Sequence, residues 1–134
     1  MIQEKAQIYA CLDACIKVLG EYYDLPGEKQ TDKKEALAQY YSFTQRLNAS
    51  LSSLDAETAR LASQIQASDA CNDYARVKQL SRIFELTVSA RKLAEEFLVS
   101  TEQLLKGGEG DTSYSIKNSV NVLIKKLFLT KSSL

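Results

Sequence analysis

The chain of 134 residues has the length of a single domain, which we expect to span residues 1–134. Its 45% hydrophobic and 25% charged residues exclude a disordered or collagen-like protein. Five glycines and one proline are too few turn residues for a barrel or sandwich of many short strands. The chain has no histidine, which excludes Ser/His and Cys/His nucleophile pairs, imidazole bases and histidine-bound metals. We therefore expect a protein that is not an enzyme and holds no cofactor.

Two features of the sequence bear on its location. The first ten residues, MIQEKAQIYA, include an acid and lack the apolar stretch of a secretory signal peptide. No apolar run approaches the 18 residues that a membrane span needs. We therefore expect a cytoplasmic protein whose cysteines stay reduced.

Charge is balanced over the whole chain but not along it. Lys and Arg together number 17, as do Asp and Glu, so no overall field attracts nucleic acid. Residues 112–134 carry four lysines and no acid, which leaves residues 1–111 with four more acids than bases. These lysines are a candidate patch for a nucleic acid or an anionic membrane, and such binding is the alternative function. The basic patch consists of Lys117, Lys125, Lys126 and Lys131.

Hydrophobic spacing predicts helices in chain order. Apolar residues at steps of three and four indicate a first helix over about residues 2–23, followed by a stop at Leu25-Pro26-Gly27. A second helix is expected over about 32–66, with Thr31 or Asp32 as its cap. Its apolar seam repeats every three or four residues through four heptads, as in a coiled coil, and spans about 43 Å. The seam consists of Leu37, Tyr40, Thr44, Leu47, Leu51, Leu54, Thr58, Leu61 and Ile65.

A turn within residues 66–73 is expected next, with Ser68 or Asp69 starting another helix. That helix is expected over about 70–106, where two adjoining apolar stripes indicate contacts with more than one neighbour. The Gly107-Gly108-Glu109-Gly110 segment ends it and lacks the strand and the Lys-Ser/Thr of a phosphate-binding loop. A last helix is expected over about 113–130. We expect its apolar face to pack on the bundle rather than on a membrane.

The three cysteines have a structural and a functional interpretation. The interpretation we favour is that Cys11, Cys15 and Cys71 are buried, reduced thiols that act as small hydrophobic side chains. The alternative takes Cys11 and Cys15, four residues apart on one helix face, as metal ligands. Tetrahedral zinc would then need Cys71 and a carboxylate to complete its set. We expect no metal.

The tyrosines supply a candidate binding surface. Tyr22 and Tyr23 precede the proline turn, whereas Tyr40 and Tyr41 follow it. Adjacent helical residues point about 100° apart, so one member of each pair can enter the core while the other faces outward. We expect the four rings to converge near the turn into one aromatic patch. Leu51 and Leu54 of the seam extend this candidate partner-binding surface.

These patterns predict an all-α, up-and-down helical bundle, with two long helices in an antiparallel hairpin flanked by two shorter ones. Its layout is similar, in architecture alone, to that of flagellar and type III export chaperones. We expect a non-enzymatic module that binds a protein partner, as a chaperone, adaptor or small subunit does. If the short helices stack side by side, an apolar strip of the seam stays exposed, from which we expect a homodimer.

Overall fold

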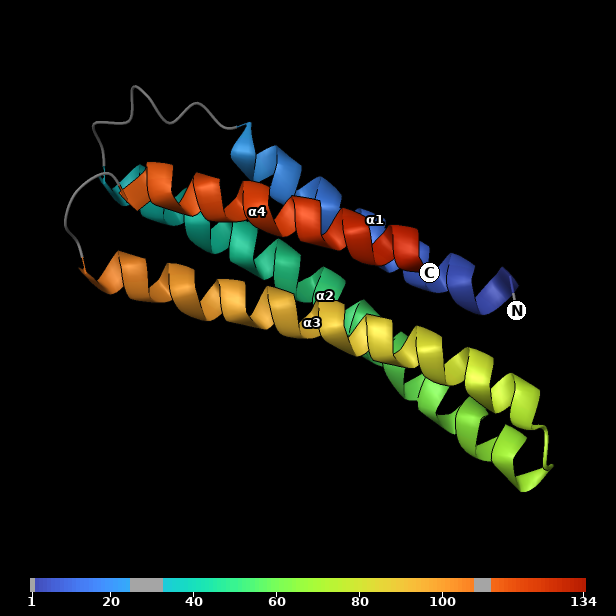
Figure 1. The fold of residues 1–134 in the computed structure, drawn as a ribbon. Coiled ribbons are helices and arrows are strands. Elements are labelled where there is room, and N and C mark those ends of the chain that lie inside the picture. The colour runs from blue at the N-terminus through green and yellow to red at the C-terminus, as the bar shows by residue number, and fades with distance from the viewer. Residues whose placement is uncertain (1, 25–32, 108–111) are drawn as a thin grey trace.

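The computed structural model describes residues 2–24, 33–107 and 112–134, and these form helices and no strand. Each helix runs antiparallel to the one before it (Figure 1). The predicted all-α, up-and-down bundle, with two long helices in an antiparallel hairpin, is therefore confirmed. Its helices are α1 (Ile2–Tyr23), α2 (Lys33–Ala70), α3 (Tyr74–Gly107) and α4 (Thr112–Ser133).

The four helices close into a ring in chain order. α1 packs against α2 and α4, and α3 packs against the same two helices. At 1.5 Å per residue, the 38 residues of α2 span about 57 Å, whereas the 22 residues of α1 or of α4 span about 33 Å. Figure 1 shows the result: α1 and α4 lie side by side, and the α2–α3 hairpin projects past the two termini.

The turn between the long helices differs from the prediction. α2 continues to Ala70 and α3 begins at Tyr74, so neither Ser68 nor Asp69 starts a helix. The reversal is a Schellman motif: the Asn72 amide donates to the Asp69 carbonyl (3.0 Å), and the Asp73 amide donates to the Ser68 carbonyl (2.9 Å). Asn72 takes the left-handed conformation that this motif requires, with φ of 60°.

Asp73 caps the helix that follows this turn. Its carboxylate accepts a hydrogen bond from the Arg76 amide at 3.2 Å, which is the geometry of an N-cap residue. The cap residue of α3 is therefore Asp73, four positions after the predicted Asp69. The caps predicted for α2, Thr31 and Asp32, lie outside the described residues, as do the Leu25-Pro26-Gly27 stop and most of the glycine segment after Gly107.

The core runs along the axis of the ring and takes apolar side chains from every helix. Within the seam of α2, Leu47, Leu51, Leu54 and Leu61 are at most 2% exposed. Leu37 is the only leucine of the seam that reaches the surface. The short helices do stack side by side, but the strip expected to stay exposed is covered by the other helices. The homodimer stays a prediction, without the exposed strip from which it was inferred.

Candidate partner-binding groove

The two tyrosine pairs divide between the core and the surface. Tyr22 and Tyr40 are buried, with ring centroids 6.4 Å apart in an edge-on arrangement, whereas Tyr23 is 45% and Tyr41 is 58% exposed. Tyr41 contacts Tyr40, with centroids 5.8 Å apart. Among the described aromatic residues, Tyr23 makes no ring contact with the other three. The predicted division of each pair between core and surface is therefore observed, and three of the four rings, Tyr22, Tyr40 and Tyr41, meet near the turn, whereas Tyr23 stays apart from them.

The buried tyrosines belong to an aromatic layer that sequence analysis missed. Phe43 stacks on Tyr22, with centroids 4.3 Å apart, and packs edge-on against Phe97 of α3 at 6.1 Å. The Tyr40 hydroxyl lies 2.7 Å from the hydroxyl of Thr101, which is also buried. Phe43 follows Tyr40 by three residues on α2, so its position on the same helix face was the available signal.

A groove opens above this layer, between the end of α1 and the start of α2. It has a volume of about 440 Å³, within the range of ligand and peptide pockets. Apolar side chains that reach into the core line one side of it, and charged and amide side chains line the rim. The lining residues are Val18, Glu21, Tyr22, Glu35, Ala38, Gln39, Ser42, Phe43 and Arg46.

The rim of the groove carries charges of both signs. The Arg46 guanidinium donates a hydrogen bond to the Glu21 carboxylate, which joins α2 to α1 across the groove. Both side chains are about half exposed, so this ion pair contributes little to stability, on the order of 1 kcal/mol or less. Glu35 adds a second carboxylate to the rim. Neither Glu21 nor Arg46 was predicted as a site residue, because in the sequence each resembles an ordinary solvent-exposed charged residue of a helix.

The phenols beneath the groove are held neutral. Burial raises the pKa of Tyr22 to about 12, with a smaller contribution from Tyr40. Burial also raises the pKa of Tyr40. Both rings are therefore uncharged near neutral pH, and the ring of Tyr22, which lines the groove, presents apolar surface there. Such a floor can contact an apolar group but cannot act as a base there.

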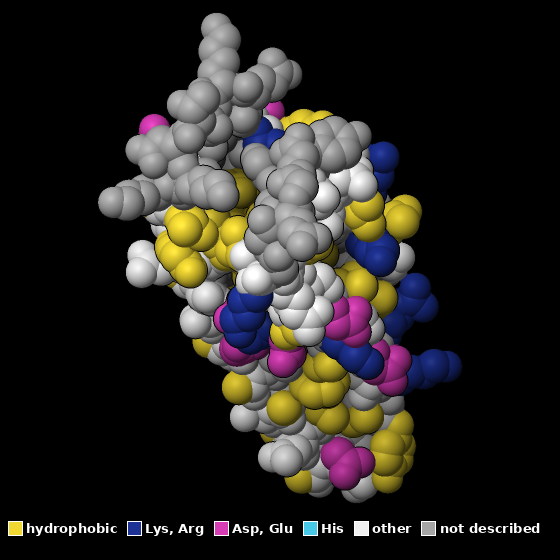
Figure 2. Space-filling view, turned by 90° about the vertical axis from the view of Figure 1, so that its left-hand side faces the viewer, with side chains coloured by type: hydrophobic (Ala, Val, Ile, Leu, Met, Phe, Trp, Pro, Cys, Tyr) yellow, Lys and Arg dark blue, Asp and Glu magenta, His cyan; other side chains and the backbone are white. Residues whose placement is uncertain are grey.

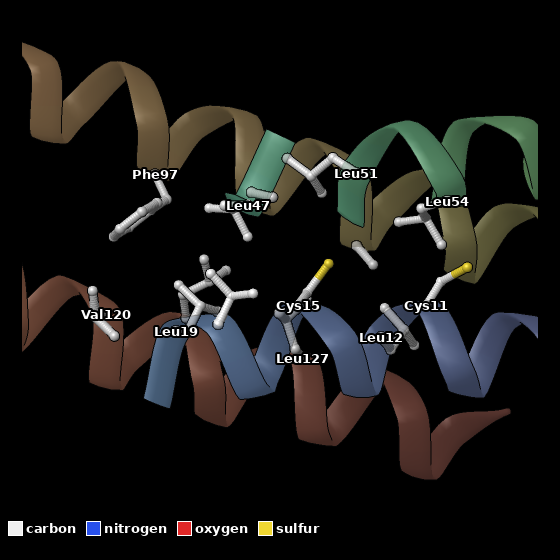
Figure 3. Packing of buried hydrophobic residues seen from close by; sticks show 14 of the residues in the cluster. Cys11, Leu12, Cys15, Leu19, Leu47, Leu51, Leu54, Phe97, Val120 and Leu127 are labelled. Atoms are coloured by element: carbon white, nitrogen blue, oxygen red, sulfur yellow. The ribbon is translucent and has the colours of Figure 1, made fainter. Parts of the chain in front are cut away.

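The structure corrects two residues of the predicted partner surface. Leu51 is 2% and Leu54 is 1% exposed, so both belong to the core and cannot contact a partner of the folded chain. Figure 3 shows them on α2, pointing into the space between the helices, into which Cys15 and Leu19 also point from α1. Their heptad spacing is typical of both an internal seam and an intermolecular coiled coil, and here the seam is internal.

The cysteines do not come together as a site. Cys11 and Cys15 are buried, and Cys71 is exposed in the turn between α2 and α3. Burial raises the pKa of Cys15 to about 11, with a further contribution from Cys11, so its thiol is neutral and poorly nucleophilic. Across the described parts of the chain, no cluster of three or more Cys, Asp or Glu residues is placed to hold a metal ion.

The lysines of the basic patch fall into two groups. Lys131 donates a hydrogen bond to Asp13 at 2.6 Å and lies over the Tyr9 ring, 5.8 Å from its centroid, so it helps to fix α4 on α1. Lys117 is partly buried. Lys125 and Lys126 are exposed and form no ion pair with the described residues. Figure 2 shows hydrophobic and charged side chains interleaved over one end of the bundle, without a continuous area of one charge.

Neither membrane topology nor similarity to known proteins assigns a function. None of the helices, over the described residues, is long and apolar enough to cross a bilayer. No protein-family model, curated protein or solved structure matches the chain.

Proposed function

We propose that the chain is a non-enzymatic protein-interaction module that binds a segment of a partner protein in the groove between α1 and α2. The observation that carries this proposal is an open groove with an aromatic floor and a charged rim. Buried aromatic contacts supply most of the energy of protein interfaces, while a polar rim supplies orientation and excludes water. The aromatic contacts would come from Tyr22 and Phe43. The polar rim consists of Glu21, Arg46 and Glu35.

The chemistry of the groove narrows the kind of segment that fits. A volume of about 440 Å³ accommodates a few side chains rather than a folded domain. Among the described residues of the rim, two carboxylates, Glu21 and Glu35, stand against the guanidinium of Arg46. The favoured partner is therefore a short segment, helical or extended, that places an apolar side chain on the aromatic floor and a Lys or Arg beside it.

Two substitutions on α2, each replacing an alanine with tryptophan, test this function. Ala38 lines the groove, whereas Ala59 is exposed on the same helix and is not part of the lining. Ala38→Trp fills the groove, and Ala59→Trp adds the same ring elsewhere on the surface. Immobilised wild type, Ala38→Trp and Ala59→Trp are compared in an extract of the native host, and each retained protein is identified.

We expect at least one partner to be retained by the wild type and by Ala59→Trp and to be lost with Ala38→Trp. The purified partner should then bind with an affinity that falls at least tenfold in Ala38→Trp alone. Equal retention by all three proteins would contradict the groove as the binding site. Circular dichroism of both variants should show the same helical content as the wild type.

A further inference from the structure

The outer face of α4 exposes large apolar side chains. Its inward face is already used: Ile116, Val120, Leu123 and Leu127 are buried in the bundle. On the opposite side, Val122 is 44% and Leu129 is 69% exposed, two helical turns apart. Lys125 and Lys126 lie between them, at positions three and four after Val122.

Phe128, 49% exposed, lies at one side of this stripe. The five residues that make up what we call the α4 ridge are Val122, Lys125, Lys126, Phe128 and Leu129.

The charge of the ridge is uncompensated. α4 contains no acidic residue, so no carboxylate lies within the ridge. Among the described residues, the carboxylate that forms an ion pair with α4 is that of Asp13 of α1, which Lys131 binds at 2.6 Å. On the other side, α3 contributes Arg82, whose guanidinium donates to the Ser133 carbonyl at 3.5 Å. The ridge therefore combines free positive charge with exposed apolar side chains.

This combination selects among the possible occupants. A second copy of the chain would place Lys125 and Lys126 of one ridge against those of the other, which is repulsive in a twofold interface. A nucleic acid would gain from the lysines but not from the aliphatic Val122 and Leu129, and the ridge has no Arg for phosphates or bases. A bilayer with anionic lipids uses both parts, because its headgroups attract the lysines and its acyl boundary accepts the apolar side chains.

We propose that the α4 ridge binds the surface of an anionic lipid bilayer, with Lys125 and Lys126 at the headgroups and Val122, Phe128 and Leu129 inserted beside them. The lysines bend toward the headgroups while their apolar stems lie along the inserted side chains. The bundle stays folded, since the apolar face of α4 remains in the core. The ridge is separate from the α1–α2 groove, so this proposal is independent of the partner segment.

Vesicle binding measures the proposed interaction directly. The chain has no tryptophan, so Leu129→Trp introduces a single reporter into the ridge. Its emission should shift to the blue with phosphatidylcholine vesicles that contain roughly a third phosphatidylserine, and not with pure phosphatidylcholine. In cosedimentation, Lys125→Glu/Lys126→Glu should weaken binding of the otherwise unmodified chain to the anionic vesicles. Each lysine near such a surface is worth about fivefold in affinity, so losing two costs about 25-fold, and reversing their charge costs more.

Two controls separate the ridge from general charge effects. Lys78→Glu/Lys92→Glu makes the same change of charge at exposed residues of α3 and should leave binding within about twofold. Val122→Ser/Leu129→Ser keeps the lysines and should weaken binding about tenfold if the apolar side chains insert. An equal loss in the α3 variant would overturn the proposal, as would no binding to anionic vesicles at low salt. Binding of single-stranded RNA that depends on the lysines but not on Val122 and Leu129 would favour a nucleic acid instead.

Discussion

The hydrogen bond between Tyr40 and Thr101 gives a sharp test of the core beneath the groove. The Thr101 hydroxyl has a single hydrogen, which it donates to the Leu98 carbonyl at 3.2 Å. We therefore expect the Tyr40 phenol to donate to the Thr101 oxygen, 2.7 Å away, since this arrangement uses both hydroxyl hydrogens. Both side chains are buried, so a hydroxyl hydrogen left without an acceptor here would not find water instead.

This assignment predicts that removing the two partners has unequal costs. Tyr40→Phe removes the donor and leaves Thr101 bonded to Leu98, so we expect the free energy of unfolding to fall by about 1 kcal/mol. Thr101→Val keeps the shape of the side chain but leaves a buried phenol hydrogen without an acceptor, which costs about 2 kcal/mol. The double variant has no orphaned donor, so its cost should be about 1 kcal/mol smaller than the sum of the two.

Urea unfolding monitored by circular dichroism measures all four proteins, provided that the slope with denaturant is the same for each. Two results would refute the reasoning. If Thr101→Val costs no more than Tyr40→Phe, the phenol has found another acceptor. If the two costs simply add, the hydroxyls are not coupled.

Three further predictions concern the stability of the bundle. Cys11→Ala/Cys15→Ala should lower the free energy of unfolding by about 1–3 kcal/mol through lost core volume and leave partner binding intact. The prediction would be contradicted if the wild type bound zinc stoichiometrically and this variant did not. Gly20→Ala should raise the free energy of unfolding by about 0.5–1 kcal/mol in urea titrations, because Gly20 is helical and an added Cβ meets nothing within 4 Å. A lower free energy of unfolding would show an unforeseen clash. Tyr22 and Cys15 have pKa values raised from 10.0 to about 12 and from 9.0 to about 11, so the unfolded chain loses their protons first. The free energy of unfolding should be unaffected by these groups below pH 9 and fall between pH 9 and 12, by at most about 3 kcal/mol for each group. In thermal unfolding, Tyr22→Phe should lose less stability over this pH range than the wild type. The same pH dependence for both proteins would refute the prediction.

The helices were predictable because their apolar residues repeat with helical spacing over long stretches. The first helix, expected over about 2–23, is observed at Ile2–Tyr23. The turn at the hairpin tip was misplaced because the usual sign of a Schellman motif is glycine, and Asn72 takes that position here. Asn tolerates the left-handed conformation, but it occurs in many other settings, so its presence alone does not mark a turn.

The candidate site was harder to predict than the fold, because it depends on how the helices are set against each other. Spacing alone predicts that one tyrosine of each pair is buried, but not that Tyr22 and Tyr40 would meet each other inside. The Arg46–Glu21 pair connects residues 25 positions apart, and the groove exists only because α1 and α2 leave space between their side chains at this level. The seam likewise could not reveal whether Leu51 and Leu54 face a neighbouring helix of the same chain or of another.

The two proposed surfaces lie on different parts of the ring, which has a consequence for how they would act together. The groove belongs to α1 and α2, while the ridge belongs to α4, which packs against α1 and α3 and lies diagonally across the ring from α2. A segment bound in the groove therefore leaves the ridge open to a bilayer. Two lysines and three partly exposed apolar side chains would by themselves give only weak membrane affinity, and stable membrane attachment usually combines two weak signals. A partner that is itself held at an anionic membrane would supply the second signal, because binding in the groove raises the effective concentration of the ridge at the same surface.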